Sequence, residues 1–303
     1  MQVKMEDNAT LWHMSLGHLH YGGLKEMSNK GMVHGIPSMD FSGSFCEDCV
    51  IGNQTRNSFQ KKAIYHATKP LELVHTDICG PITSKSYSSK RYFLTFIDDY
   101  SRRTWVYFLN EKSEALKVFK KFKMLVEKKT GKNIKALRSD RGGEYTSNAF
   151  TEYCEEQGIR RFLTAPYSPQ QNGVAERKNR TILDMVRSML KCKELPKELW
   201  AEAVQCAVYI QNRCVHSILG DKTPQELWSG KKPTVSHLKV FGSTAYSHIP
   251  DQQRTKLDDK SRKFIFIGYD EKTKAYRLLD PVAKKVTVSR DVKIQEDDAW
   301  DWN

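Results

Sequence analysis

Residues 71–79 read Leu-Glu-Leu-Val-His-Thr-Asp-Ile-Cys, a run that alternates in polarity and is rich in β-branched side chains. This pattern predicts a β-strand. Two further strand-like runs follow at residues 91–97 and 104–109, and the turn-forming segment 98–101 lies between them. Three strands joined in this way predict an antiparallel meander, which opens the central domain of the chain.

The elements after the meander predict an α/β domain. Apolar residues recur at helical spacing from Leu116 to Val126, and Gly131 is suited to end that helix. Shorter patterns predict strands at residues 134–140 and 160–164, and helices at residues 148–157, 174–191 and 196–214. The order βββαβαβαα indicates a mixed sheet covered by helices, in a domain that spans residues 69–215.

Two smaller domains are predicted on either side. Residues 1–60 are rich in His, Cys and Gly and form the first. Residues 238–295 form the last, a small β-barrel-like module, because short strand-like runs recur there at regular spacing. These runs cover residues 241–249, 263–269, 275–279 and 285–294. An acidic tail with two tryptophans, residues 296–303, follows without an evident role.

Composition excludes several classes of protein. Hydrophobic residues make up 39% of the 303 residues, enough for packed cores. No run approaches the roughly 18 apolar residues of a membrane span, and the first ten residues lack the apolar core of a secretion signal. We therefore expect no membrane partner and no secretion, and we interpret the seven cysteines as thiols or metal ligands rather than disulfides.

The positive charge of the chain is concentrated in its middle third. The formal net charge is +13, and residues 69–191 account for +10 of it, with 24 basic against 14 acidic side chains. A local excess of this kind indicates a polyanionic partner such as nucleic acid. A merely soluble basic surface is the alternative.

Two histidines and two cysteines have the spacing of a zinc site. His13 and His18 are separated by four residues, and Cys46 and Cys49 by two. Together they supply the four ligands of a closed, structural tetrahedral site. A segment of this size has little core of its own, so a metal would contribute to its folding. His20 and His34 are rival ligands, and the alternative is that all four are ordinary helix and core residues.

Three carboxylates indicate a second kind of metal site. Asp77 and Asp140 end predicted strands, and Glu176 lies in the first turn of a predicted helix. If the two strands are neighbours, the three acids meet at one sheet edge, where their repulsion favours Mg²⁺ or Mn²⁺. Acids at strand ends are common, however. The rival acids in the same region are Asp98, Asp99 and Glu144.

Long motifs around these residues resemble one known family. The residues at 75–81, 139–144 and 165–180 read His-Thr-Asp-Ile-Cys-Gly-Pro, Ser-Asp-Arg-Gly-Gly-Glu and Ala-Pro-Tyr-Ser-Pro-Gln-Gln-Asn-Gly-Val-Ala-Glu-Arg-Lys-Asn-Arg. They resemble the integrase core of copia-type LTR retrotransposons. The sequences at 11–18 and 46–49 resemble the pre-integrase zinc domain of that family, and those at 238–242 and 263–270 its C-terminal region.

The resemblance implies an RNase H-like core with a D,D,35,E active site. In this chain the catalytic, metal-binding acids would be Asp77, Asp140 and Glu176, and the zinc ligands His13, His18, Cys46 and Cys49. The implied reaction trims the 3′ ends of the element's DNA and joins them to target DNA. It implies double-stranded DNA as partner, a homo-multimer, and action in the nucleus after a cytoplasmic particle stage.

The chain departs from the family at one position beside the site. Arg141 follows Asp140 where the family commonly has Asn, and a guanidinium there either contacts DNA phosphate or perturbs the metals. On the helix of Glu176, basic side chains are candidates for binding phosphates. They are Arg177, Lys178, Arg180, Arg187 and Lys191. The competing functions are a nuclease of the same fold that never joins strands, and a catalytically silent DNA-binding protein derived from an integrase.

Overall fold

The computed structural model describes residues 8–37, 46–53, 66–164 and 172–302. The chain divides into two compact units. One contains residues 55–183 and 215–233, and the other contains residues 1–54, 184–214 and 234–303. The division falls inside the long helix α7 (Gly173–Cys192), which contributes its first half to one unit and its second half to the other.

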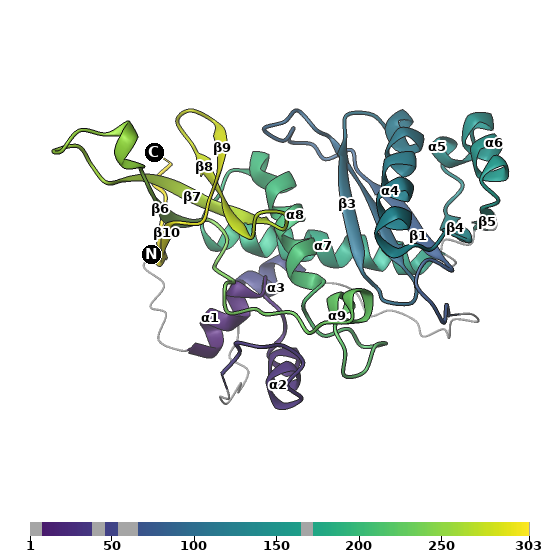
Figure 1. The fold of residues 1–303 in the computed structure, drawn as a ribbon, viewed down its shortest axis with the longest axis horizontal. Coiled ribbons are helices and arrows are strands. Elements are labelled where there is room, and N and C mark those ends of the chain that lie inside the picture. The colour runs from purple at the N-terminus through teal and green to yellow at the C-terminus, as the bar shows by residue number, and fades with distance from the viewer. Residues whose placement is uncertain (1–7, 38–45, 54–65, 165–171, 303) are drawn as a thin grey trace. The chain divides into compact units, whose positions relative to one another are not determined.

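The first of these units is built on a five-stranded mixed sheet (Figure 1). Its spatial order is β3-β2-β1-β4-β5, with β1, β2 and β3 antiparallel and β4 and β5 parallel to β1. The strands are β1 (Val74–Cys79), β2 (Tyr92–Asp98), β3 (Thr104–Leu109), β4 (Ala136–Ser139) and β5 (Arg160–Leu163). The predicted meander and mixed α/β sheet are therefore confirmed.

Helices cover one face of this sheet through an aromatic core. Phe119 and Phe122 of α4 (Ala115–Thr130) pack against Phe96 of β2, and the rings of Phe96 and Phe122 stack with centroids 4.2 Å apart. Gly131 ends α4 in the left-handed region, at φ 66°, as its position in the sequence predicts. The same unit contains η1 (Lys112–Glu114), α5 (Gly143–Thr146), α6 (Asn148–Glu156) and α9 (Pro224–Ser229).

The second unit combines short helices with an antiparallel sheet. The sheet order is β10-β6-β7-β8-β9, which leaves β9 and β10 at its two edges. Its strands are β6 (Ser243–His248), β7 (Ser261–Asp270), β8 (Ala275–Asp280), β9 (Lys285–Ser289) and β10 (Val292–Ala299). The run predicted as one strand at 285–294 is two strands, because the chain turns at Arg290 and Asp291 and then pairs with β6 instead of β8.

The acidic tail has a structural role in this unit. Its first residues continue β10, where the Glu296 carboxylate accepts hydrogen bonds from Lys239 Nζ at 2.8 Å and from the Val240 backbone N–H at 2.9 Å. The ammonium of Lys193 donates to the Glu296 carbonyl at 2.7 Å. The tail therefore joins the edge of the sheet to the segment that precedes it.

The remaining helices of the second unit include its most buried one. They are α1 (Asn8–Ser15), α2 (Tyr21–Asn29), α3 (Glu47–Asn53), η3 (Lys197–Leu199), α8 (Trp200–Gln211) and η4 (Asp251–Gln253). Almost every residue of α8 is buried, and Tyr209 stacks on Tyr269 of β7 with ring centroids 4.4 Å apart. Trp200 and Tyr209 therefore pack in the core. Within the described ranges, no helix combines the length and apolar character that crossing a membrane requires.

Candidate active site and metal centre

The sheet register places two of the predicted acids on one face and at one end. In the parallel pairing of β1 and β4, His75 lies opposite Arg138. Asp77 and Asp140 each follow two residues later. Because side chains alternate along a strand, this step of two keeps both carboxylates on the same face of neighbouring strands. Asp140 directly follows β4 as predicted, whereas Asp77 lies within β1, two residues before its end. The predicted adjacency of the first and fourth strands is therefore present.

The third acid is close enough to influence the other two. Burial is the main cause that raises the pKa of Asp77 to about 7, and the negative charges of Asp140 and Glu176 add to it. Burial and Asp140 likewise raise the pKa of Glu176, against the opposing charges of Arg177 and Arg180. The site thus concentrates negative charge that is not fully balanced by protein cations. Such a site favours divalent cations with a preference for oxygen ligands.

An amide that the sequence reading missed connects the helix of Glu176 to Asp77. Asn179 lies three residues after Glu176 on α7 and is buried. Its Nδ2 donates to Asp77 Oδ2 at 2.8 Å, and its Oδ1 accepts from Thr95 Oγ1 at 2.9 Å. Residues at i and i+3 share a helix face, so the position was available as a signal in the sequence.

Three further hydrogen bonds support the segments that carry Asp77 and Asp140. The hydroxyls of Thr76 and of the buried Tyr145 lie 2.9 Å apart, and Asn172 Nδ2 donates to the Thr76 carbonyl at 3.4 Å. The backbone N–H of Gly142 donates to Asp140 Oδ1 at 3.1 Å. These bonds restrict the positions from which Asp77 and Asp140 project.

The unusual Arg141 is anchored to the backbone. Its Nε donates to the Thr164 carbonyl at 2.7 Å, while the side chain as a whole stays exposed. The guanidinium therefore ties the turn after β4 to the end of β5.

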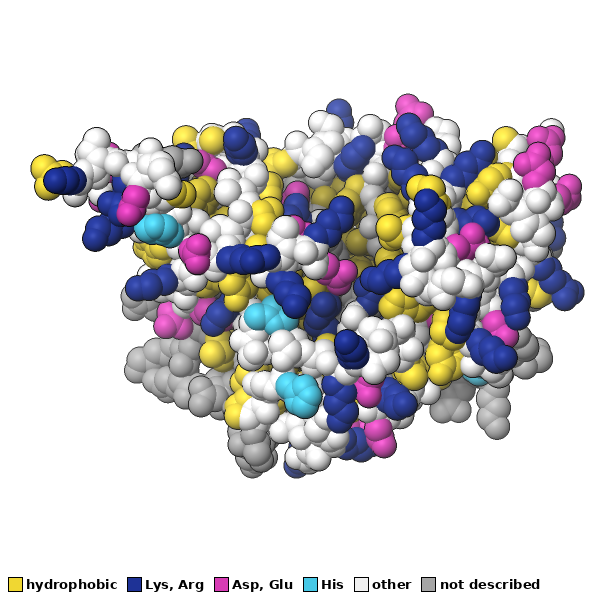
Figure 2. Space-filling view, in the orientation of Figure 1, with side chains coloured by type: hydrophobic (Ala, Val, Ile, Leu, Met, Phe, Trp, Pro, Cys, Tyr) yellow, Lys and Arg dark blue, Asp and Glu magenta, His cyan; other side chains and the backbone are white. Residues whose placement is uncertain are grey.

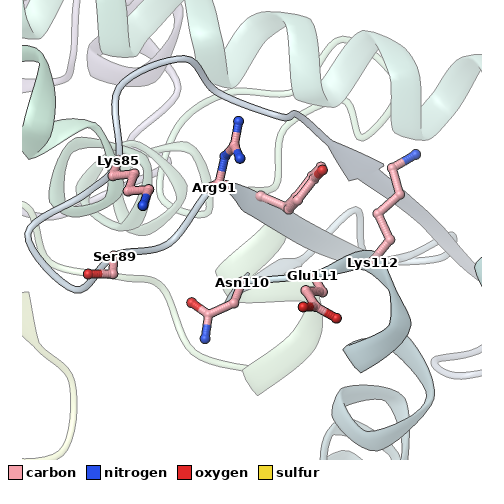
Figure 3. A pocket seen from close by; sticks show the side chains of 7 residues that line it. Lys85, Ser89, Arg91, Asn110, Glu111 and Lys112 are labelled. Carbon is pink, nitrogen blue, oxygen red and sulfur yellow. The ribbon is translucent and has the colours of Figure 1, made fainter.

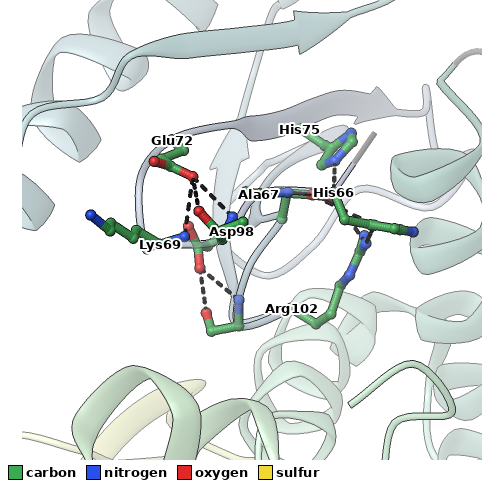
Figure 4. A network of polar contacts seen from close by, with 10 residues as sticks. His66, Ala67, Lys69, Glu72, His75, Asp98 and Arg102 are labelled. Atoms are coloured by element: carbon green, nitrogen blue, oxygen red, sulfur yellow. Dashed lines mark hydrogen bonds and ion pairs between the residues drawn. The ribbon is translucent and has the colours of Figure 1, made fainter. Parts of the chain in front are cut away.

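Two of the rival acids serve the fold at the opposite end of β1 (Figure 4). Asp98 pairs with Val74 and is the last residue of β2, three positions away from the partner of Asp77. Its carboxylate accepts from the Leu71 N–H at 2.8 Å and from Ser101 N–H and Oγ at 2.8 and 2.6 Å. Asp98 is thus a buried structural residue rather than a member of the exposed turn.

Asp99 is occupied by a buried cation and a buried histidine. Its Oδ1 lies 2.8 Å from His75 Nε2 and 2.9 Å from Arg102 Nη2, and its Oδ2 accepts from the Ala67 N–H at 2.7 Å. The third rival, Glu144, is nearly buried and lies 3.6 Å from Lys112 Nζ. All three rival acids therefore have local partners other than Asp77.

The three predicted acids are spaced more widely than a ready-made ligand cluster. In the part of the chain that the structure describes, only two groups of three or more His, Cys, Asp or Glu place their ligand atoms within 4.8 Å of one another. Both groups contain His18, and neither contains Asp77.

The predicted zinc ligands meet in the first of these groups. His13 Nε2 and His18 Nδ1 are 3.2 Å apart, and Cys49 Sγ lies 3.4 Å from each of them. Cys46 Sγ lies 3.5 Å from His18 Nδ1. A tetrahedral zinc ion, with bonds of about 2.3 Å to sulfur and about 2.0 Å to nitrogen, separates neighbouring ligand atoms by similar distances. The four residues therefore fit a metal of this kind.

A backbone carbonyl orients one of the two histidines. His13 Nδ1 lies 2.8 Å from the Leu19 carbonyl, which leaves Nε2 to face the ligand cluster. Asp48 and Cys192 form the second group with His18, and the sequence reading missed both. Of the rival ligands, His20 accepts from the Gly23 N–H as the cap of α2, and His34 is exposed and pairs with Thr234.

The candidate phosphate-binding residues of α7 differ in their surroundings. Arg177 and Arg180 are exposed and Lys178 is half-buried in the unit that contains Glu176. In the other unit Lys191 is exposed, but Arg187 donates through Nε to the Gly52 carbonyl at 2.8 Å and pairs with Asp184. Arg187 is therefore engaged in holding α3 against α7. Figure 2 shows further Lys and Arg side chains spread over the visible face, with fewer acids between them.

Three parts of the chain match known domain families. Residues 67–169 match the integrase core domain, residues 2–54 match the GAG-pre-integrase domain, and residues 243–303 match the retroviral polymerase SH3-like domain. The chain carries an integrase core domain. Together with the sheet order described above, this match confirms the RNase H-like fold.

The chain has relatives among the Pol polyproteins of plant copia-type retrotransposons, so the resemblance carried by its motifs is confirmed. It is 48% identical over 291 residues to the retrovirus-related Pol polyprotein from transposon TNT 1-94 of Nicotiana tabacum. The aligned region makes up 96% of this chain and 22% of that polyprotein. It is 34% identical to those from transposons RE1 and RE2 of Arabidopsis thaliana, covering 94% of this chain and 19% of each. The chain thus spans about a fifth of their length.

Solved structures are also similar, and one of them aligns with most of this chain. It is the simian T-cell lymphotropic virus intasome in complex with PP2A regulatory subunit B56 gamma. The similarity covers 82% of this chain and 87% of that chain, with 17% identity and a TM-score of 0.46.

Proposed function

We propose that this chain is a DNA integrase that trims the 3′ ends of element DNA and transfers them into target DNA. The observation that carries the proposal is the convergence of Asp77, Asp140 and Glu176. β1, the turn after β4 and α7 bring the three carboxylates near enough for the charges of Asp140 and Glu176 both to raise the pKa of Asp77. An isolated structural acid would not need this arrangement.

The acids act as ligands in this proposal. Asp77, Asp140 and Glu176 would hold Mg²⁺ or Mn²⁺, which supplies Lewis-acid stabilisation of the attacking and leaving oxygens in an in-line displacement at phosphorus. Asn179 and Thr95 hold the Asp77 carboxylate in one orientation. Arg177, Lys178 and Arg180, on the same helix as Glu176, would bind DNA phosphates near the reacting bond.

The zinc centre has a structural role. His13, His18, Cys46 and Cys49 would form a closed site with every position filled by protein, so it would take no part in the reaction. A hydrogen bond from Cys49 is the main cause that lowers the pKa of the Cys46 thiol, and further hydrogen bonds from His13 and His18 lower it in spite of burial. A thiolate is the form of cysteine that binds metal.

The partners follow from the reaction. The substrates are two double-stranded DNAs, the element ends and the target, and their joining takes place in the nucleus after a cytoplasmic particle stage. Insertion of two element ends at one target requires two active sites, so we propose that the chain acts as a homo-multimer.

A strand-transfer assay tests the proposal. A labelled duplex with a recessed 3′ end is incubated with the protein, Mg²⁺ and a plasmid target. We expect Mg²⁺-dependent joining that is abolished in Asp77→Asn, Asp140→Asn and Glu176→Gln and retained in Glu152→Gln, an exposed acid on α6. Cleavage without joining would identify a nuclease, and DNA binding without either reaction would identify a silent binding protein.

A further inference from the structure

A basic pocket lies beyond the end of β1, in the unit that contains the carboxylates. It has a volume of about 520 Å³ and is open to solvent. Three cations and one carboxylate contribute to its wall. The lining residues are Lys85, Ser89, Arg91, Tyr92, Asn110, Glu111 and Lys112 (Figure 3).

Three separate segments supply the cations. Lys85 lies in the loop between β1 and β2, Arg91 immediately precedes β2, and Lys112 begins η1 after β3. Backbone hydrogen bonds hold the segments together, from Ile82 N–H to the Arg91 carbonyl at 2.8 Å and from Arg91 N–H to the Leu109 carbonyl at 3.1 Å. The pocket wall is therefore fixed by the sheet.

Close packing at Gly80 shapes the wall. A Cβ at Gly80 would lie 2.7 Å from the Arg91 carbonyl oxygen and 2.8 Å from the Tyr92 ring, and Gly80 has a φ of 131°. Only glycine allows the loop to approach β2 so closely at this φ. The loop between β1 and β2, which carries Lys85, is thus held against the start of β2, next to Arg91.

The pocket lies near the catalytic acids. Phe93, next to Tyr92, pairs with Cys79 two positions beyond Asp77, and Asp77 itself pairs with Thr95. At about 3.3 Å per residue, the strand distance from Asp77 to the pocket is on the order of 10 Å. Lys112 also lies 3.6 Å from Glu144, which is four residues after Asp140. A DNA strand that reaches Asp77 would pass within reach of this pocket.

The chemistry of the lining suits a phosphodiester backbone. Arg91 and Lys112 point to the same side of the strand ends, whereas the Glu111 carboxylate points to the other side (Figure 3). Ser89 and Asn110 add neutral hydrogen-bonding groups to the lining. Exposed cations drawn from several segments bind repeated phosphates well and make no demand on base sequence.

We propose that Lys85, Arg91 and Lys112 bind the phosphate backbone of a DNA segment that extends away from the catalytic acids. The proposal rests on the proposed integrase function. Both the element end and the target carry this backbone, so the chemistry is common to the two DNAs and the experiment separates them.

Direct binding by the full-length protein tests the pocket without requiring catalysis. A fluorescent 30-base-pair duplex is titrated over a range of salt concentrations, without divalent ions, against the Lys85→Gln/Arg91→Gln double variant. The control is Lys121→Gln/Lys128→Gln, which removes the same charge from the exposed face of α4. We expect several-fold weaker binding and a salt slope that is smaller by about 2 for the pocket variant only, since each lost phosphate contact lowers the slope by about 1.

Equal losses in the two double variants would overturn the proposal, because they would show a general charge effect. An unchanged pocket variant would overturn it as well, even if the wild type joins DNA. A wild type that binds through the pocket but never joins DNA would refute the integrase function and leave the pocket intact.

End trimming and strand transfer by the pocket variant show whether the pocket binds the element end or the target DNA. Weaker end trimming in the pocket variant would assign the pocket to the element end. Normal trimming with a several-fold higher requirement for target plasmid would assign it to the target. Either result supports the proposal, whereas normal trimming together with a normal target requirement would contradict it.

Discussion

Asn179 Nδ2 donates a 2.8 Å hydrogen bond to Asp77 Oδ2, and this bond joins the helix of one proposed catalytic acid to the strand of another. The Asn179 carbonyl is fixed in turn by Thr95 Oγ1 at 2.9 Å. The amide is buried, so its orientation is determined by these partners rather than by water. Asn179 therefore orients the Asp77 carboxylate and also holds α7 against β1 and β2.

We expect Asn179→Ala to reduce the rate of strand transfer about 10- to 100-fold, as small displacements of reacting groups commonly do. DNA affinity should change little, because no phosphate-binding side chain is removed. Single-turnover rates and duplex binding are measured side by side, with the exposed Asn133→Ala as control. A normal rate in Asn179→Ala would show that the bond is dispensable for positioning Asp77.

The sequence was sufficient to predict the meander, the mixed sheet and the adjacency of the strands that precede or carry Asp77 and Asp140. The assignment of Asp77, Asp140 and Glu176 to an active site stays a prediction. Strand alternation and helical spacing are local patterns, and they carried these predictions. The bonds of Asn179 and the burial of Asp98 are results of tertiary packing between segments that are far apart in the chain. An isolated polar residue has the same appearance in a sequence whether it caps a turn or enters a core.

Asp77 should make the metal-free protein less stable as the pH rises. Its pKa is raised from 3.8 to about 7, so the folded state favours the protonated form. The destabilisation is absent below pH 3.8, the ordinary pKa, and it grows as the pH rises from there to about 7. Above that pH it is complete, and the loss of unfolding free energy is then at most about 4 kcal/mol. In Asp77→Asn this pH dependence should be lost.

Thermal unfolding without divalent ions, from pH 4 to pH 8, measures this difference between wild type and Asp77→Asn. Adding Mg²⁺ at pH 8 should raise the Tm of the wild type and leave that of the variant nearly unchanged, because a bound cation offsets the carboxylate charge. Parallel pH profiles for the two proteins would contradict the assignment of Asp77 to a crowded acidic site.

The zinc centre should be needed for folding of its own unit. We expect one zinc per chain in the full-length protein, lost in Cys49→Ser and on treatment with a strong chelator. The isolated segment 1–60 is a poor test, since Arg187 and Ser188 of α7 bind the carbonyls of Gly52 and Asp48. Metal analysis and circular dichroism of the full chain are measured together, with Cys154→Ser as a buried control away from the cluster. Full zinc content in Cys49→Ser would refute this ligand set.

Asp99 should be essential for stability and not for chemistry. Arg102 is 1% exposed, its Nε and Nη1 lack hydrogen-bond partners among the described residues, and Asp99 lies 2.9 Å from its Nη2. Burial acts to raise the pKa of Asp99, but hydrogen bonds from His75 and Ala67 and the charge of Arg102 together hold it at about 2.

Asp99→Asn removes the countercharge and leaves the guanidinium of Arg102 buried, which we expect to cost about 3 kcal/mol of unfolding free energy. Urea unfolding measures that loss against the exposed Glu152→Gln. At a temperature where Asp99→Asn is still folded, its strand-transfer rate should match the wild type. A fully stable but inactive Asp99→Asn protein would instead place this carboxylate in the catalytic site.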